Sequence, residues 1–332
     1  MYFIMKILKV FLKMNKAGIV FAGHGVSTDW VDRTTEEVHT DISDFCNSIK
    51  VLRDLDYEFI SMNKLIEISK NRFQHNRHWV HLTFDDGYQN NFDTIYPYLK
   101  ERNIPFSVFI STHHIETQEY FPTFWLRAAA YLKLPLETLF PDLTVSPDIA
   151  RTLFEKKLHY ASFEEHKAIM NKVKSLFSHE NMQALESFKN DIPLSLEKLK
   201  ELSSDPLVHI GSHSHHHIIY HKNQNDDIAS DEMQTSRDLI TSTWAVEENP
   251  TFCFPNGDWS ANWIKLSVEK GYSMTFTSAS GYVGKRTQPY LMPRFWLSTK
   301  NRTLTICALS LLGDLSLKLY GRSRLRNISI VD

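Results

Sequence analysis

The chain has 332 residues, enough for one barrel-sized domain or two smaller ones. Its composition, 42% hydrophobic and 23% charged, is ordinary for a globular protein, and a net charge of −2 argues against a nucleic-acid partner. The three cysteines are scattered and include no CxxC pair, which weakly indicates a reducing compartment.

The two ends of the chain are expected to form extensions. Lysines interrupt the apolar run of residues 1–16 and no small-residue cleavage site follows, which favours an amphipathic surface helix over a signal peptide or a spanning helix. Residues 301–332 mix leucines with basic residues and predict a helical extension. We favour a helix that docks against the rest of the protein, and peripheral contact of this helix with a membrane is the alternative. The expected location is the cytoplasm, with membrane association as an option.

Short apolar segments alternate with helix-length segments between these extensions. The expected strands are residues 18–23, 57–60, 79–84, 105–111, 207–211, 251–254 and 273–277. Repeated strand–helix units predict an α/β fold with a parallel sheet, open or closed into a barrel. In such folds the chemistry lies at the carboxyl ends of the strands.

Residues 115–206, approximately, break this alternation. They are rich in Leu, Lys and Glu and are too long for a plain loop, so we expect a helical insertion over the mouth of the barrel. A role in substrate selection and a purely structural role are equally open.

Two adjacent carboxylates follow the third strand. Asp85 and Asp86 would point opposite ways on a regular strand, but a turn into Gly87 lets both face one site. One could bind a metal while the other stays free as a base. Taken alone, an Asp-Asp-Gly sequence is often only a turn.

A ladder of histidines follows the fifth strand. His209, His213, His217 and His221 recur at intervals of four, and residues four apart on a helical turn share a face where two imidazoles can bind one ion. We favour His213 and His217, since they directly follow a strand end. Three protein ligands, a free carboxylate and an open position for water predict a mononuclear hydrolase site.

Residues 83–87, TFDDG, together with residues 213–217, HSHHH, resemble the polysaccharide deacetylase family, the NodB-homology domain of carbohydrate esterase family 4. The resemblance spans roughly residues 17–300. It implies a distorted, incomplete (β/α) barrel of seven strands. It also implies hydrolysis of N-acetyl, sometimes O-acetyl, groups on an N-acetylated glycan substrate.

The resemblance also assigns roles to residues. Asp85 matches the catalytic base, and Asp86, His213 and His217 match the ligands of a divalent metal, usually Zn²⁺. Residues 252–257 match a third motif, in which the backbone N–H after the proline helps to hold the oxyanion. That motif carries Pro255 and Asn256 in this chain.

The chain departs from the family pattern at two places. Cys253 stands where many members have an arginine that orients the base, and Arg294 is the natural substitute, with a surface charge as the alternative. No histidine follows His221, so the family's late histidine acid is missing. His24 could replace it as the acid, or could instead be structural or contact the substrate.

These patterns favour a metal-dependent deacetylase acting on a polysaccharide or on a lipid- or nucleotide-linked glycan during surface-polysaccharide biosynthesis. One alternative is a non-catalytic glycan-binding protein that retains the barrel. Another is an amidase acting on a small non-sugar molecule. The sequence leaves the oligomeric state open.

Overall fold

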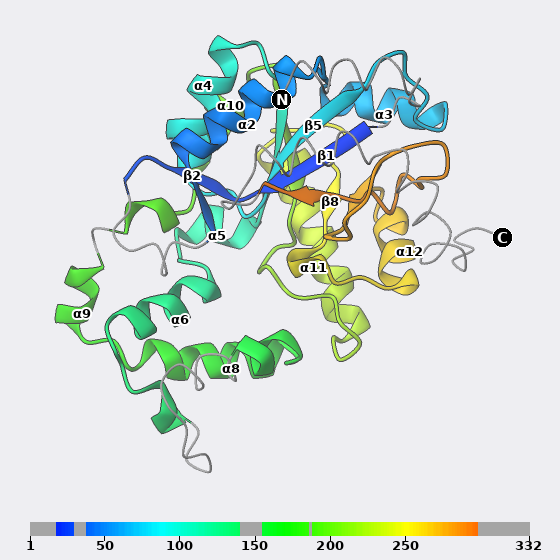
Figure 1. Ribbon diagram of the computed structural model, residues 1–332. Coiled ribbons are helices and arrows are strands. Elements are labelled where there is room, and N and C mark those ends of the chain that lie inside the picture. Colours follow the sequence, from blue (N-terminus) through cyan, green and yellow to red (C-terminus); the bar gives the residue numbers. More distant parts are fainter. Residues whose placement is uncertain (1–17, 30–37, 140–154, 186–187, 298–332) are drawn as a thin grey trace.

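The computed structural model describes residues 18–29, 38–139, 155–185 and 188–297 (Figure 1). The predicted extensions, residues 1–16 and 301–332, lie outside this part of the chain. Among the described residues, no helix combines the length and the apolar character needed to cross a bilayer.

A parallel sheet curls into a half-barrel at the centre of the fold, which confirms the predicted fold class. Seven strands follow one another in the order β10-β1-β5-β6-β7-β8-β9, and β4 pairs with the start of β5. These strands are β1 (Gly18–Gly23), β4 (Glu58–Phe59), β5 (Trp79–Phe84), β6 (Phe106–Ile110), β7 (Val208–Ser212), β8 (Phe252–Cys253), β9 (Thr275–Phe276) and β10 (Phe295–Trp296). A separate pair joins β2 (Gly25–Ser27) to β3 (His39–Asp41).

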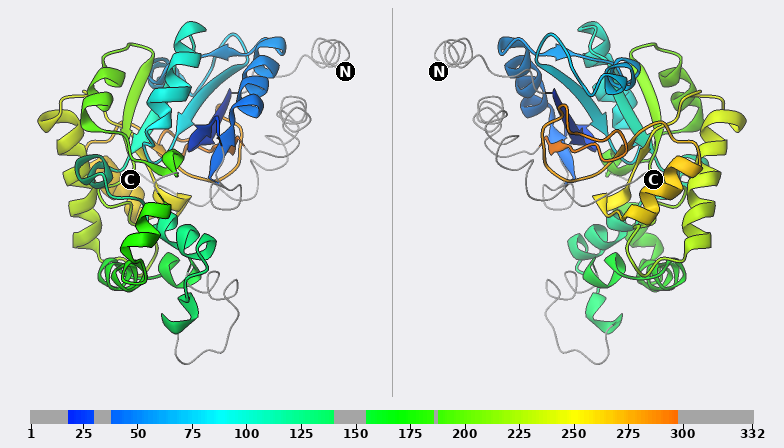
Figure 2. Two further views of the ribbon diagram at one scale, coloured as in Figure 1. Left: turned by 90° about the vertical axis from the view of Figure 1, so that its left-hand side faces the viewer. Right: turned by 90° about the vertical axis from the view of Figure 1, so that its right-hand side faces the viewer.

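Helices pack around the curled sheet (Figures 1 and 2). They are α2 (Ile42–Asp54), α3 (Met62–Lys70), α4 (Tyr96–Glu101), α5 (Thr112–Thr117), α10 (Leu196–Ser203), α11 (Asp226–Asp238) and α12 (Ala261–Glu269). Helix α2 buries an apolar stripe that includes Phe45, Ile49 and Leu52. Ser61 caps α3, because its side chain accepts a hydrogen bond from the backbone N–H of Lys64.

Strand β10 was not among the expected strands. It pairs with β1 through only two residues, in the register Phe21↔Phe295 and Ala22↔Trp296. Two residues are too few to produce a recognisable alternation of apolar and polar side chains. The strand matters for the site, because it fixes the position of Arg294 beside the carboxyl end of β1.

The middle of the chain forms a helical lobe, described for residues 120–139, 155–185 and 188, that extends away from the sheet (Figure 1). It contains α6 (Pro122–Tyr131), α8 (Phe163–Lys174) and α9 (His179–Ala184). An apolar core of its own includes Phe124, Met170, Val173 and Phe188. Helix α10, which also lies within residues 115–206, instead buries Leu199 and Leu202 in the core of the barrel.

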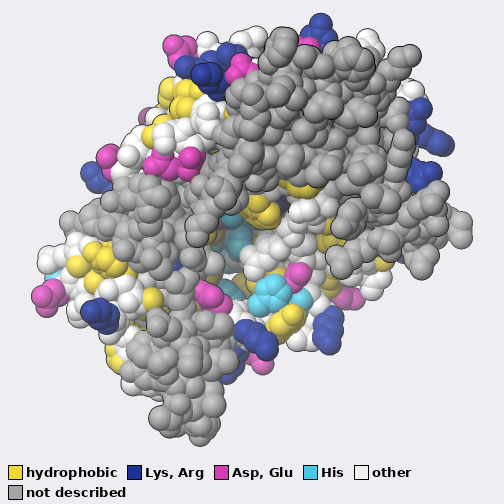
Figure 3. Space-filling view, viewed as in Figure 1, with side chains coloured by type: hydrophobic (Ala, Val, Ile, Leu, Met, Phe, Trp, Pro, Cys, Tyr) yellow, Lys and Arg dark blue, Asp and Glu magenta, His cyan; other side chains and the backbone are white. Residues whose placement is uncertain are grey.

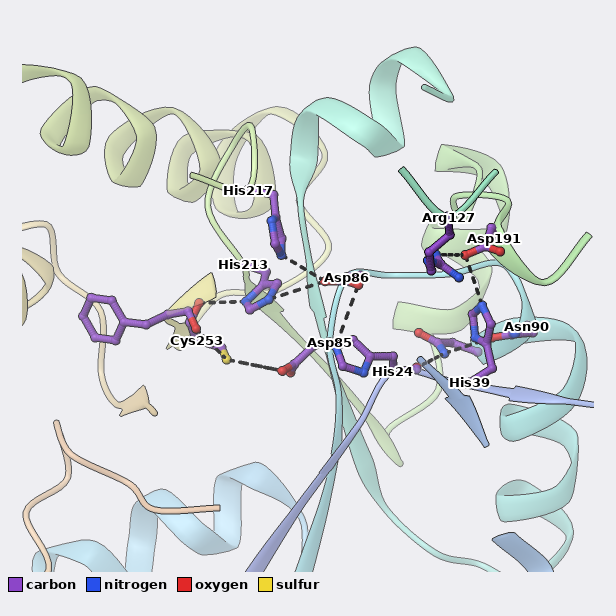
Figure 4. Close-up of polar contacts among 12 residues, drawn as sticks. His24, His39, Asp85, Asp86, Asn90, Arg127, Asp191, His213, His217 and Cys253 are labelled. Carbon is purple, nitrogen blue, oxygen red and sulfur yellow. Dashed lines mark hydrogen bonds and ion pairs between the residues drawn. The ribbon is translucent and has the colours of Figure 1, made fainter. Parts of the chain in front are cut away.

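A buried ion pair fastens the helical lobe to the barrel. Arg127 of α6 donates to Asp191 Oδ1 at 2.6 Å, and His39 Nε2 lies 3.3 Å from the same oxygen (Figure 4). Burial alone would raise the pKa of Asp191, but His39 and Arg127 outweigh it and the pKa lies below its ordinary value. The lobe is therefore held in place next to the carboxyl ends of the strands.

Candidate metal centre and active site

The carboxylate turn has the geometry expected from the sequence. Strand β5 is buried throughout and delivers Asp85 at its end. Asp86 then adopts φ 74° and Gly87 φ 86°, so the chain turns sharply and presents both carboxylates to one region (Figure 4). A side chain at position 87 would approach Ile110 to 2.9 Å, which explains the glycine. A left-handed Asp86 is a costly conformation that the surrounding structure must enforce.

His213 and His217 both approach Asp86 from the end of β7. Their Nε2 atoms lie 3.5 and 3.3 Å from Asp86 Oδ1 (Figure 4). The expected helical turn is wrong, however. Residues 213–217, the histidine loop, are irregular, and left-handed φ angles at Ser214 and His217 bring the two rings together.

The environment of these three side chains fits a divalent metal. Asp86 Oδ1 is buried and has no hydrogen-bond partner among the described residues. His213 Nδ1 donates to the carbonyl of Cys253 at 2.8 Å, which leaves the lone pair on Nε2 facing Asp86. Burial lowers the pKa of His213 to about 4, so the ring is neutral at pH 7. Two imidazoles and one carboxylate form a donor set that suits Zn²⁺ with a position left open.

Asp85 is held by a buried arginine. Arg294 is 1% exposed and donates two hydrogen bonds to the carboxylate, at 2.7 Å to Oδ1 and 2.8 Å to Oδ2. Burial alone would raise the pKa of Asp85, but the guanidinium outweighs it and the pKa lies below its ordinary value. Cys253 Sγ lies 3.7 Å from Oδ1 of the same carboxylate. Arg294 therefore lies where it can orient Asp85, the place that the sequence suggested for it.

The other predicted residues lie around this centre. His24 Nε2 is 4.0 Å from Asp86 Oδ2, and the ring stacks on Trp296 with centroids 5.1 Å apart. Pro255 is buried after β8, while Asn256 is exposed and adopts φ 54°. Sequence reasoning missed Trp296, which is 43% exposed beside His24.

Sequence reasoning also missed Glu232 on α11. Its Oε2 accepts hydrogen bonds from Ser214 Oγ at 2.6 Å and from the backbone N–H groups of His215 and His216 at 3.0 and 2.8 Å. Glu232 therefore fixes the histidine loop. A signal for it exists in the sequence, since an acidic residue shares a helical face with the buried Ala229 and Met233.

A hollow opens on this face of the molecule, with histidine side chains inside it (Figure 3). A small pocket between the helical lobe and the histidine loop is lined by Leu158, Ala161, Phe163, His166, His216, His217, Ile218, Ile219 and Gln224. The lobe thus contributes to the surroundings of a candidate metal ligand.

A family model described as polysaccharide deacetylase matches residues 73–275, more than half of the chain. The matched part contains Asp85, Asp86, both histidines and the turn after β8. His24 and Arg294 lie outside it.

Several solved structures share the fold at low identity. The Streptococcus pyogenes deacetylase PplD in complex with acetate is 13% identical with a TM-score of 0.58, covering 87% of this chain and 96% of that one. IcaB from Ammonifex degensii is 13% identical with a TM-score of 0.60, covering 90% and 98%. The BpsB deacetylase domain from Bordetella bronchiseptica is 16% identical with a TM-score of 0.53, covering 86% and 97%. These likenesses establish the fold.

A comparison with curated proteins found no match. The family match and the shared fold nevertheless agree with the pair of motifs in the sequence. The chain belongs to the polysaccharide deacetylase family, and it is a hydrolase acting on carbon–nitrogen bonds.

Proposed function

We propose that this chain removes N-acetyl groups from a sugar of a polysaccharide or of a lipid- or nucleotide-linked glycan, with Zn²⁺ held by Asp86, His213 and His217. The observation that carries the proposal is the buried Asp86 Oδ1, which faces two imidazole nitrogens and has no hydrogen-bond partner among the described residues. A carboxylate oxygen in that position is costly unless a cation compensates for its burial.

Asp85 acts as the base in this proposal, with Arg294 keeping it ionised and oriented. A bound divalent ion supplies Lewis-acid polarisation and makes water a stronger nucleophile at neutral pH. Asp85 takes the proton of the attacking water, and the backbone N–H of Asn256 stabilises the oxyanion. His24 passes a proton to the departing amine. Trp296 offers an exposed ring for a sugar to stack on.

The paired Asp85 and Arg294 also argue against a protein that only binds glycans. Cys253 stands at the family's arginine position and would suit such a protein, but the bidentate contact from Arg294 can supply the orientation that the arginine gives. An aligned, ionised base has no evident use in binding alone. We place the reaction in surface-polysaccharide biosynthesis.

Replacing Arg294 should damage both activity and stability. Arg294→Met leaves a buried carboxylate without its cation, and breaking such a pair costs about 3–5 kcal/mol of the free energy of unfolding. We expect kcat to fall by roughly 100-fold as the base loses its orientation. Thermal unfolding and acetate release would be measured beside Arg286→Met, which removes an exposed arginine. Equal behaviour of the two variants would contradict the role of Arg294.

Removing His24 should have a smaller effect. Burial lowers the pKa of His24, although Asp86 and Asp85 oppose the shift, so little of the acid form exists at neutral pH. We therefore expect His24→Ala to reduce kcat by about 10- to 100-fold, at the lower end of general acid catalysis. Metal content should stay unchanged. Turnover close to that of the unmodified protein would exclude His24 as the acid.

The proposal is tested by measuring metal content together with acetate release. The purified protein would be offered N-acetylated oligosaccharides, nucleotide sugars and lipid-linked glycans, before and after chelation and after Zn²⁺ is restored. We expect acetate release that chelation abolishes and Zn²⁺ restores. Acetate release that survives complete metal removal would overturn the metal-dependent mechanism.

A further inference from the structure

A second group of metal-ligating side chains lies beside the active site. His113 of α5 meets His215 and His216 of the histidine loop, and one ligand atom from each ring lies within 4.8 Å of the others. The ring centroids of His113 and His216 are 4.4 Å apart, and those of His215 and His216 are 4.3 Å apart. The proposed active site uses none of these rings.

Each of the three rings is oriented by a partner on one nitrogen. Glu232 Oε1 lies 2.6 Å from His216 Nδ1, Thr112 Oγ1 lies 2.8 Å from His215 Nδ1, and Glu119 Oε2 lies 3.3 Å from His113 Nε2. Within the described residues, the second nitrogen of each ring has no hydrogen-bond partner. A carboxylate or hydroxyl on one nitrogen, with the other available, is the arrangement that metal-binding histidines adopt.

The backbone around this group is already fixed. The N–H of His113 donates to the carbonyl of His215 at 2.9 Å, and Ser111 Oγ donates to the same carbonyl at 2.8 Å. Helix α5 and the histidine loop therefore stay in register without an ion. Zn²⁺ in a tetrahedral site holds its ligand atoms roughly 3.3 Å apart, so rotations of the three rings that bring their ligand nitrogens closer together would close the site.

The local charges also favour a cation. Glu232 and Glu119 contact the rings directly. Burial lowers the pKa of His113, and the nearby Glu232 and Glu116 oppose that shift. Lys174 of α8 pairs with Glu119 and offsets part of this negative charge. The carboxylates outnumber the ammonium group, so a divalent ion would be partly neutralised by groups already present.

We propose that His113, His215 and His216 form a second, structural Zn²⁺ site, distinct from the catalytic centre, that clamps α5 to the histidine loop. Three imidazoles suit Zn²⁺, and water or Glu119 can complete the coordination. The site stiffens the loop that carries His213 and His217. The inference does not depend on the deacetylation reaction, because the two sites use different ligands.

The test is the zinc stoichiometry of the chelator-stripped full chain after it is titrated with Zn²⁺ alone. We expect two equivalents for the unmodified protein and one for His113→Gln, with affinity for the lost equivalent falling at least about 100-fold. His113 is the preferred position for the substitution, because it lies outside the histidine loop. The matched control is His179→Gln, which removes an exposed histidine from α9 and should keep both equivalents.

Two further variants separate this site from the catalytic one. Asp86→Asn should lose the catalytic equivalent and keep the second, and Asp86→Asn combined with His113→Gln should lose both. His215→Gln should match His113→Gln, which guards against misfolding of one variant. The second site would be overturned if the protein bound a single equivalent of Zn²⁺ that His113→Gln and His215→Gln both kept and that Asp86→Asn lost. If instead the single equivalent of Zn²⁺ were kept in Asp86→Asn and lost in His113→Gln and His215→Gln, the result would support the second site and contradict the catalytic assignment.

Discussion

Asp85→Asn is expected to lower kcat by about 1,000-fold or more, while the amount of Zn²⁺ bound stays the same as in the unmodified protein. Removing a general base costs roughly 100- to 10,000-fold, and the amide cannot accept the proton of the attacking water. Asp86, His213 and His217 are untouched, so the metal site keeps its ligands. Acetate release and metal content of the same preparation would be measured together.

Stability must be followed in that variant, because Arg294 loses its counter-charge. The amide oxygen of Asn can still accept one hydrogen bond, but the buried guanidinium is no longer neutralised. We expect a lower midpoint of thermal unfolding with a cooperative transition retained. Asp231→Asn, at an exposed position on α11, is the matched control and should change neither activity nor stability. Full activity of Asp85→Asn would show that another group is the base.

Much of the candidate site could be predicted because its residues follow buried strands. Asp85 comes directly after β5, and His213 comes directly after β7. The carboxyl ends of parallel strands meet at one edge of the sheet, so residues far apart in the chain converge there. The turn at Gly87 was also predictable, since a glycine after two carboxylates permits a left-handed backbone.

The path between the two histidines could not be predicted. Spacing by four suggested a helical turn, but Ser214 and His217 adopt left-handed φ angles that residue type does not reveal. Those conformations are held by tertiary contacts, chiefly the carboxylate of Glu232 on the loop backbone. Local patterns carry no information about such a contact.

Arg294 illustrates a second limit. It lies 209 residues from Asp85, and only the resemblance to the family suggested that it replaces the arginine absent at position 253. Its placement depends on β10, a strand of two residues that no periodicity could indicate. The core of the helical lobe was similarly hidden, because helical patterns show which face is apolar but not what covers it.

His213→Ala is expected to lose both metal and activity, which distinguishes a ligand from the base. The change removes one of the three proposed protein ligands and leaves the Cys253 carbonyl without its donor. We expect the catalytic equivalent of Zn²⁺ to bind at least about 100-fold more weakly and acetate release to become undetectable at limiting Zn²⁺. Isothermal titration of the chelated protein would measure the affinity.

The matched control for His213→Ala is His221→Ala, four residues beyond His217 in the same ladder. His221 Nε2 donates to the carbonyl of Ala161, so its loss should cost about 1 kcal/mol of stability and leave metal binding intact. Both variants remove an imidazole that bonds a backbone carbonyl, but of the two histidines His213 is the one that contacts Asp86. Equal loss of Zn²⁺ binding in both variants would mean that the ladder binds metal through a set of residues other than Asp86, His213 and His217.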